Sequence, residues 1–244
     1  MVIKLEGKKY EILIDKEHTI NYYGRTLHRI RALKDFDGVK KGDVGGFVQT
    51  EDNSSQYGNC WIYDDAICMD NARVCNSAKM YNRSCMYNNS KMFDNSRMCD
   101  YSKMYDNSIM LDNSIMYDNS RMFGNSTMYE NSRMYDNSIM LDNSEMFGNS
   151  ILKNNDKLYG KINKPFKKIF QHQCEKRLLI AILTEENEIL YSIGCQVGIT
   201  KEEFINRIYN DCKIEGNGLV KYPYRQEYLD MIDIIETYFE KFKN

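Results

Sequence analysis

A motif of six residues, Met-Tyr-Asp-Asn-Ser-x, recurs without insertions through the middle of the chain. Between Asp106 and Met140 the sequence reads DNSIM LDNSIM YDNSRM FGNSTM YENSRM YDNSIM. Aligning the repeats on the methionines gives a column of apolar residues from Ile62 to Leu158, one at every sixth position. This period fits neither an α-helix, with 3.6 residues per turn, nor a coiled coil, so the pattern argues against a helical core.

Each repeat has the composition of a short strand followed by a corner. A small residue, Cys, Ala or Ser, stands two positions before each apolar one as far as Leu152, and residues at that offset point to the same side of a strand. The Asp-Asn pair is typical of tight corners, because Asn tolerates the left-handed conformation and Asp bonds its own backbone. One such unit cannot bury its apolar residue alone, whereas stacked units can, so the repeat predicts a solenoid.

The period resembles that of the hexapeptide-repeat proteins, in which an aliphatic residue is followed four positions later by a small one. Met80-Tyr81-Asn82-Arg83-Ser84-Cys85 fits this pattern, with a large aromatic residue at the second position. The resemblance implies a mainly β fold built on a left-handed parallel β-helix of triangular section. Three repeats would form each coil, giving about six coils in all.

The repeat divides the chain into four segments. We expect a β-rich N-terminal cap over residues 1–52, the β-helix over residues 53–160, a basic connector over residues 161–177 and a C-terminal ββαα module over residues 178–244. Capping is the default role of the first segment, because an open solenoid end exposes unpaired strand groups and bare core. The last segment has enough apolar residues to cap the other end or to pair with a second copy.

Local patterns place the elements of the two end segments. In the cap we expect a hairpin of Val2–Leu5 and Tyr10–Ile14 and a half-buried strand over Thr26–Leu33. In the C-terminal module, Leu178–Leu183 and Ile189–Cys195 read as two strands.

Two helices should follow these strands. Thr200 and Glu203 form a capping-box pattern that opens the first helix, and Gly216 and Gly218 would end it. Apolar residues at helical spacing mark one face of the second helix. They are Tyr228, Met231, Ile232, Ile235, Phe239 and Phe242.

The two ends of the chain carry a second, closer resemblance. The segment from Leu27 to Ala66, with its Gly-Asp-x-Gly-Gly stretch running into a Trp-x-Tyr repeat, is similar to the start of phage- and prophage-borne hexapeptide-repeat proteins. The C-terminal stretches EILYSIGCQ, ITKEEFINRI and YRQEYLDMI resemble the tail module of the same proteins. The resemblance implies a bacteriophage or prophage context and supplies no chemistry.

Charge, hydropathy and cysteine content indicate the kinds of partner and the compartment to expect. The formal net charge is −2, so the chain lacks the global basic character of most nucleic-acid-binding proteins. No apolar run is long enough to span a membrane, and Met1 leads into a charged strand instead of a signal peptide. The eight cysteines form no CxxC motif and no metal-ligand pair with a histidine. We therefore expect reduced thiols in the cytoplasm of a bacterial host.

The activities best known for hexapeptide β-helices are those of acyltransferases and of carbonic anhydrases. Both depend on histidine, as general base or as zinc ligand. His18, His28 and His172 all lie outside the repeats, and no loop interrupts the coils. The sequence therefore predicts no enzyme, no catalytic residue, no metal site and no cofactor.

Function then falls to the outer surface. Residues eighteen apart should stack on one face, which gathers tyrosines and arginines beside a row of aspartates at the adjoining corner. The predicted partner-binding residues are Tyr81, Tyr117, Tyr135, Arg97, Arg133, Asp100, Asp118 and Asp136. Aromatic ladders also stabilise sheets by cross-strand stacking. A contiguous aromatic face is nevertheless a larger apolar patch than a monomer usually exposes, and Tyr and Arg are favoured at interfaces.

Three functions compete. The first is a non-enzymatic phage protein that binds and inhibits a host nuclease or defence complex through its acidic and aromatic surface. The second is a structural or oligomerisation module that forms a homo-oligomer through an aromatic face or the C-terminal module. The third is nucleic-acid or nucleotide binding by the Tyr/Arg faces, which ranks last because the corner carboxylates repel phosphate.

Overall fold

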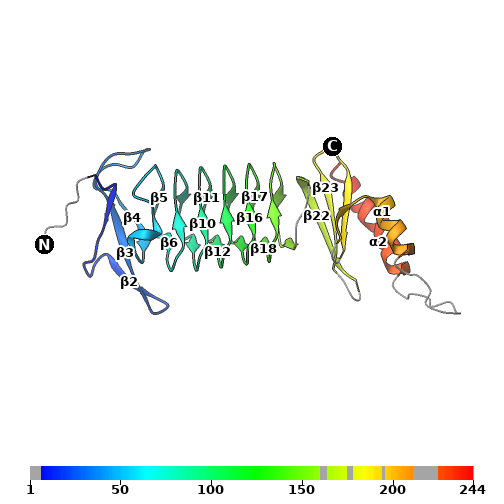
Figure 1. Ribbon diagram of the computed structural model, residues 1–244, viewed down its shortest axis with the longest axis horizontal. Helices are drawn as coiled ribbons and strands as arrows, with labels where there is room; N and C mark the ends of the chain where they lie inside the picture. The colour runs from blue at the N-terminus through cyan, green and yellow to red at the C-terminus, as the bar shows by residue number, and fades with distance from the viewer. Residues whose placement is uncertain (1–6, 160–163, 175–177, 194–195, 211–224, 244) are drawn as a thin grey trace.

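The protein is an elongated, mainly β molecule with three parts in line, as seen in a computed structural model (Figure 1). The structure describes residues 7–159, 164–174, 178–193, 196–210 and 225–243. A small antiparallel head lies at one end, a parallel β-solenoid of about six coils occupies the middle, and a sheet with two helices lies at the other end. The predicted fold class is confirmed.

The head is a small sheet that continues into the solenoid. Its elements are β1 (Tyr10–Ile12), β2 (Thr19–Tyr22), β3 (Arg25–Ala32), β4 (Val44–Val48) and the 3-10 helix η1 (Glu51–Asn53). The strand predicted over Thr26–Leu33 is confirmed as β3, which pairs antiparallel with β1, β2 and β4. Val2–Leu5, the first arm of the predicted hairpin, lies outside the described residues. Strand β4 pairs parallel with β6 and so starts one face of the solenoid.

The solenoid has three faces, each a parallel sheet of very short strands. The first face contains β6 (Ile67–Cys68), β9 (Cys85–Met86), β12 (Lys103–Met104), β15 (Arg121–Met122), β18 (Ile139–Leu141) and β21 (Lys157–Tyr159). The second contains β7 (Arg73–Val74), β10 (Lys91–Met92), β13 (Ile109–Met110), β16 (Thr127–Met128) and β19 (Glu145–Met146). The third contains β5 (Trp61–Ile62), β8 (Lys79–Met80), β11 (Arg97–Met98), β14 (Ile115–Met116), β17 (Arg133–Met134) and β20 (Ile151–Leu152).

The corners have the backbone conformation that the Asp-Asn pairs predict. The first residue of each corner lies in the left-handed region, with φ from 52° at Asp64 to 69° at Gly58. Asp, Asn and Gly occupy nearly all of these positions, because they tolerate this conformation better than other residues do. Each corner turns the chain onto the next face, and a full coil brings residue i beside residue i+18, as in Met98 beside Met116.

The apolar column is the core of the solenoid. Every member from Ile62 to Leu158 is fully buried. The small residues two positions earlier are also fully buried, and several serines donate a hydrogen bond to the carbonyl three residues back, as Ser90 does to Tyr87 at 2.8 Å. The serine hydroxyls therefore line the inside of the coils, and those of Ser84, Ser102, Ser126 and Ser144 form no hydrogen bond with any residue that the structure describes.

The head covers the first coil with aromatic side chains and one buried lysine. Trp61 is buried against Tyr10 and Phe36, with ring centroids 6.2 and 5.4 Å away. Lys9 is 1% exposed, and its amine donates to the carbonyl oxygen of Cys60 at 2.9 Å. This end of the core is thereby closed to water.

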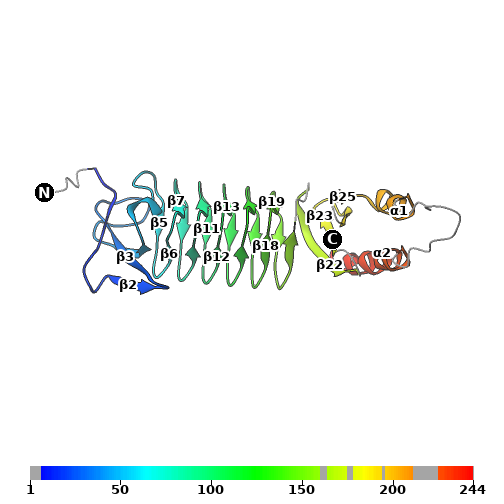
Figure 2. The ribbon, with the colours of Figure 1, turned by 60° about the horizontal axis from the view of Figure 1, so that its bottom comes forward.

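The C-terminal sheet closes the other end. Its strands are β22 (Phe166–Gln173), β23 (Leu178–Thr184), β24 (Ile189–Ile193) and β25 (Gln196–Ile199), in that order across the sheet. Ile169, Ile180 and Ile182 belong to the same core cluster as the solenoid methionines. Cys174, Leu179 and other residues belong to a second cluster with the helices. Figure 2 shows both helices beyond the sheet, on the side away from the coils.

Two expectations for this region are wrong. Residues 166–173 form strand β22 instead of part of a connector, and the module has four strands before its helices instead of two. A β-bulge between Phe166 and Lys168 breaks the period-two pattern that would have revealed β22. Lysines also obscured it, although Lys168 is 8% exposed and its amine pairs with Asp156 at 3.2 Å.

The two helices are α1 (Lys201–Asn210) and α2 (Arg225–Glu240). The predicted capping box is confirmed: the backbone N–H of Glu203 donates to Thr200 Oγ1 at 3.2 Å, and that of Thr200 donates to Glu203 Oε2 at 2.9 Å. Gly216 and Gly218 lie outside the described residues. In the part of the chain that the structure describes, neither helix is long and apolar enough to cross a membrane.

Candidate binding face

The third face of the solenoid, called here the tyrosine face, carries the residues that the sequence singled out. Tyr63, Tyr81, Tyr117 and Tyr135 follow its buried apolar residues, and each phenol ring is half-buried. Tyr63 and Tyr81 stack with ring centroids 4.7 Å apart, and Tyr117 and Tyr135 stack at 5.2 Å. Strand pairing at i and i+18 produces both stacks, so the predicted ladder is real and supports the coils by cross-strand contact.

The ladder is interrupted at its centre. Cys99 occupies the position between Tyr81 and Tyr117, and among the described residues no ring contact joins these two tyrosines. Burial raises the pKa of both phenols, and the neighbouring Cys99 adds to each shift. Strand register places Cys99 between the two tyrosines, because Met98 pairs with Met80 on one side and with Met116 on the other. We call this position the Cys99 gap.

The first face provides an uninterrupted ladder for comparison. Tyr87, Tyr105 and Phe123 stack with successive centroid distances of 4.9 and 4.6 Å. The head covers one end of that ladder, because Tyr22 packs there and its hydroxyl lies 3.3 Å from that of Tyr87. Three consecutive coils can therefore hold three stacked rings on one face. On the tyrosine face, Cys99 occupies the position of the middle ring.

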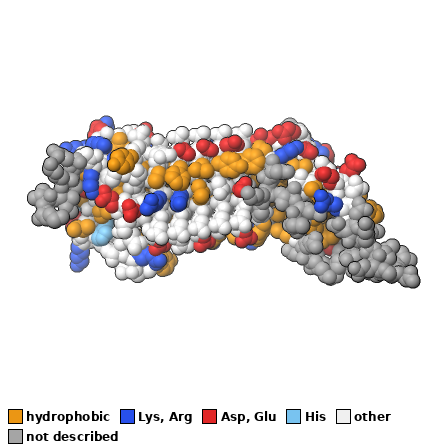
Figure 3. Space-filling view, viewed as in Figure 1, with side chains coloured by type: hydrophobic (Ala, Val, Ile, Leu, Met, Phe, Trp, Pro, Cys, Tyr) orange, Lys and Arg blue, Asp and Glu red, His pale blue; other side chains and the backbone are white. Residues whose placement is uncertain are grey.

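Basic side chains border the tyrosine face on one side. Arg97 and Arg133 precede the buried methionines of their strands, are exposed, and form no ion pair with any residue that the structure describes. Lys79, in the same row, pairs with Asp37 of the head at 2.6 Å. Figure 3 shows this kind of banding on one face of the solenoid, with a hydrophobic stripe, an acidic border and basic side chains beside it.

The corner on the other side carries the predicted aspartates, and they have a structural task. Oδ2 of Asp100, Asp118 and Asp136 each accepts a hydrogen bond from the backbone N–H of the next corner, at 3.4, 3.1 and 2.8 Å. Oδ1 of Asp100 also accepts from the Asn82 amide at 2.8 Å. Asp118 and Asp136 are exposed and Asp100 is half-buried, and the row ties successive coils together.

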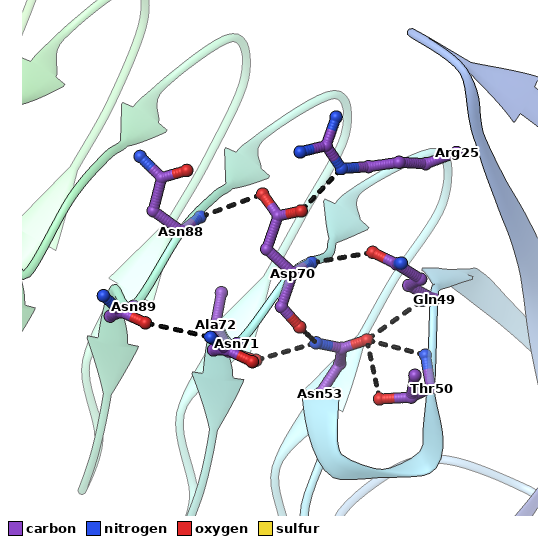
Figure 4. Close-up of polar contacts among 9 residues, drawn as sticks. All are labelled: Arg25, Gln49, Thr50, Asn53, Asp70, Asn71, Ala72, Asn88 and Asn89. Carbon is purple, nitrogen blue, oxygen red and sulfur yellow. Dashed lines mark hydrogen bonds and ion pairs between the residues drawn. The ribbon is translucent and has the colours of Figure 1, made fainter.

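The same arrangement recurs at another corner. Asp70 Oδ2 accepts the backbone N–H of Asn88 at 3.2 Å, while the side-chain amide of Asn71 donates to that of Asn89 at 3.1 Å (Figure 4). The carboxylate ladder is therefore a general device of this solenoid, which explains its recurrence without any partner.

A prediction follows for Asp118. Asp118→Ala should lower the free energy of unfolding by about 1–2 kcal/mol, because it removes the acceptor for Asp136 and places alanine at φ 56°. Asp118→Asn keeps an oxygen acceptor and a residue that tolerates this φ, so it should change stability by about 0.5 kcal/mol or less. Urea denaturation of both variants measures the difference, and equal losses would show that the carboxylate ladder does not stabilise the coils.

A surface hollow adjoins the Cys99 gap. It has a volume of about 400 Å³ and is lined by Asp64, Asp65, Asn82, Arg83, Asp100 and Tyr101. Tyr101 is 52% exposed, and its ring lies 5.9 Å from the Arg83 guanidinium. Because residues 82–83 follow Tyr81 and residues 100–101 follow Cys99, the hollow opens at the corner next to the gap.

Alkaline pH should destabilise the protein through its buried acids. Burial raises the pKa of Cys99 from 9.0 to about 11, and burial also raises the pKa of Cys68. Such groups contribute stability in full below the pKa of the unfolded chain, and lose it as the pH rises toward the folded value. Burial lowers the pKa of Lys9, so this one amine makes the protein more stable as the pH rises. We expect the thiols to outweigh it.

We therefore expect the free energy of unfolding to fall between pH 8.5 and pH 11. Urea denaturation across this range measures the fall. Cys99→Ser should show a smaller fall, since serine does not ionise there, and an increase in stability with pH would contradict the assignment.

Sequence reasoning missed two features. The Cys99 gap was visible as the one thiol between Tyr81 and Tyr117 in that column. The second is a cluster of metal-ligating type, formed by His172, Cys174 and Glu227 in the C-terminal module. The i, i+2 spacing of its first two members was its signal in the sequence, whereas the position of Glu227 required the fold.

The histidines that could serve a hexapeptide-type active site are not on the coils. His18 Nδ1 lies 2.8 Å from Asp15 Oδ1 in an exposed turn of the head. His28 Nδ1 lies 2.8 Å from Thr19 Oγ1 between β2 and β3. His172 is on β22.

The chain is similar to a known protein over a short stretch. Over 38 residues it is 47% identical to a protein of Escherichia coli (strain K12) named uncharacterized acetyltransferase YdcK. The match covers 16% of this chain and 12% of the length of that relative. No family model matches the chain. The six-residue period and the parallel solenoid fit a hexapeptide-repeat protein, and the relative's name raises the question of acyl transfer.

Proposed function

We propose that this protein is a non-enzymatic binding solenoid whose tyrosine face receives an aromatic side chain of a partner protein in the Cys99 gap. The observation that carries the proposal is the interrupted ladder, in which Tyr81 and Tyr117 flank a thiol where the first face holds a third ring.

The spacing supports a ring as the occupant. Tyr81 and Tyr117 are two coils apart, roughly 9.6 Å at ~4.8 Å per coil. The Tyr87–Tyr105–Phe123 ladder fills the same two-coil distance with centroid steps of 4.9 and 4.6 Å. A ring placed over Cys99 would stack on both tyrosines, and each aromatic contact is worth about 0.5–1.5 kcal/mol beyond burial.

The charges favour a protein over a nucleic acid. Arg97 borders the gap on one side and Asp100 borders it on the other. A polypeptide can present an aromatic residue between an acidic and a basic neighbour, which suits both borders. A polynucleotide carries negative charge throughout, and the row of Asp100, Asp118 and Asp136 repels it.

Acyl transfer is the enzymatic alternative, and the name of the Escherichia coli relative is what favours it. General-base catalysis of this reaction needs a base that takes the proton from the acceptor amine or hydroxyl as it attacks the thioester carbonyl. His18 and His28 lie in the head and His172 lies in the C-terminal sheet, away from the coil faces. We expect no release of free coenzyme A when acetyl-coenzyme A is incubated with the protein and an amine mixture. Release above background would overturn the non-enzymatic part of the proposal.

The resemblance of both chain ends to phage- and prophage-borne proteins points to a bacterial host protein as the partner. Inhibition of a host nuclease or defence complex is the form we propose for that interaction. The alternative is self-association through the same face, and light scattering of the purified protein distinguishes the two before any partner is added.

The test uses a small probe with the chemistry of the proposed partner. A capped Glu-Trp-Lys peptide carrying a fluorinated tryptophan is titrated with the full-length protein and observed by fluorine NMR. We expect saturable binding, displacement by unlabelled Glu-Trp-Lys, and no displacement by Glu-Ala-Lys. Tyr117→Ala should weaken binding about twofold to tenfold through the lost stacking contact. Tyr129→Ala, which breaks the ring pair with Phe147 on another face, should leave it unchanged.

Two results would overturn the proposal. Equal binding of the peptide by the wild-type protein and by Tyr117→Ala would place the site elsewhere. Displacement by adenosine monophosphate at lower concentrations than unlabelled Glu-Trp-Lys would replace the protein partner by a nucleotide.

A further inference from the structure

Three side chains of metal-ligating type converge where the edge strand of the C-terminal sheet meets the last helix. His172 lies on β22, Cys174 follows that strand, and Glu227 lies in the first turn of α2. One ring nitrogen of His172, the sulfur of Cys174 and one carboxylate oxygen of Glu227 all lie within 4.8 Å of one another. Cys174 is fully buried, and the other two are half-buried.

The local fold explains the convergence. Residues two apart on a strand point to the same face, and Phe170 and Cys174, spaced evenly with His172, both belong to the cluster that packs on the helices. Helix α2 supplies Ile232 and Ile235 to that cluster. Packing of α2 against the sheet thus brings Glu227 over the end of β22.

We propose that His172, Cys174 and Glu227 bind a divalent transition-metal ion of the zinc class. A thiolate, an imidazole and a carboxylate are the three ligand types that zinc takes from proteins, and three protein ligands leave the fourth tetrahedral position to water. A sulfur ligand selects against magnesium and calcium, which prefer oxygen. The bound ion would tie α2 to the edge strand of the sheet that closes the solenoid.

The second group of this kind lacks the same support. Asp15, Glu17 and His18 also come within ligand distance, but they lie in one exposed turn. Asp15 Oδ1 already accepts the backbone N–H groups of Glu17 and His18, each at 3.1 Å. Local turn geometry accounts for that group. The cluster in the C-terminal module instead joins two elements more than fifty residues apart in the sequence.

Cobalt binding tests the proposal. The full-length, reduced, chelator-treated protein is titrated with Co²⁺, and the near-ultraviolet thiolate-to-cobalt charge-transfer band is recorded. We expect the band to saturate at one equivalent and to disappear when Zn²⁺ is added. Glu227→Gln and His172→Gln should weaken Co²⁺ binding about tenfold or more. Loss of a group that only supports a ligand already costs about tenfold in metal affinity, so loss of a ligand should cost at least as much.

Cysteine variants separate this site from other thiols. Cys174→Ser should lose the band, while Cys99→Ser, which removes a half-buried thiol on the solenoid, should retain it. Zn²⁺ should also raise the Tm of the wild-type protein and of Cys99→Ser more than that of Glu227→Gln, whose folding is checked by circular dichroism. Absence of the band from the wild-type protein, or its persistence in Cys174→Ser, would overturn the assignment.

Discussion

Replacing Met116 with alanine is expected to lower the free energy of unfolding by about 2–5 kcal/mol. Met116 is fully buried on β14, in register with Met98 and Met134 of the adjacent coils. Removing its side chain costs the burial of the lost atoms and leaves a cavity on the solenoid axis. Neighbouring methionines are unbranched and can move partly into that space, so the loss should fall nearer 2 than 5 kcal/mol.

Ile115 provides the matched control. It lies on the same strand but points outward and is half-buried. Ile115→Ala should cost about 1 kcal/mol or less, as expected for a site outside the core. Urea denaturation followed by circular dichroism measures both losses. If the two variants were equally destabilised, the methionine column would not be the core of the coils.

Gly46→Ala is expected to cost about 3 kcal/mol, at the upper end of the usual range for overpacking. A Cβ at this position would lie 2.4 Å from the carbonyl oxygen of Ala66 and 2.7 Å from Ile62 Cγ2. That oxygen already accepts the backbone N–H of Phe47 at 2.8 Å. Moving it would break the contact by which β4 joins the first coil, so the head would separate from the solenoid.

The backbone of Gly46 is not in the left-handed region, so the expected loss is purely steric. Val44→Ala, at an exposed position of the same strand, should change stability by about 0.5 kcal/mol or less. Thermal unfolding gives both values, and limited proteolysis reports whether the head has detached. A Gly46→Ala protein as stable as the wild type would mean that the head does not dock as described.

The repeat made the solenoid predictable because each of its residues has a single structural demand. Methionines fill the axis, serines allow the coils to approach, and Asp or Asn occupies the left-handed corner. The C-terminal module was harder to predict, because it has no repeat and because its sheet packs on the coils on one face and on the helices on the other. Strand β22 escaped detection because a bulge shifts its alternation and because Lys168 is buried by an ion pair with Asp156.

The sequence predicted which residues of the candidate site lie on one face, but not which bonds their side chains form. Spacing by eighteen correctly placed Tyr81, Tyr117 and Arg97 on one face. It did not reveal that Asp118 bonds the next coil, since that depends on the side-chain rotamer. Most residues in the same column of the repeat are aromatic, so the sequence pattern did not draw attention to the exception at Cys99. The role of these residues in partner binding stays a prediction.

Filling the Cys99 gap tests the central claim most directly. Cys99→Tyr would complete a five-ring ladder from Tyr63 to Tyr135, and Cys99→Ala would keep the gap open. We predict that Cys99→Tyr raises the free energy of unfolding by about 0.5–1.5 kcal/mol and abolishes Glu-Trp-Lys binding, while Cys99→Ala binds the peptide like the wild type. Peptide binding by Cys99→Tyr at wild-type affinity would contradict the account.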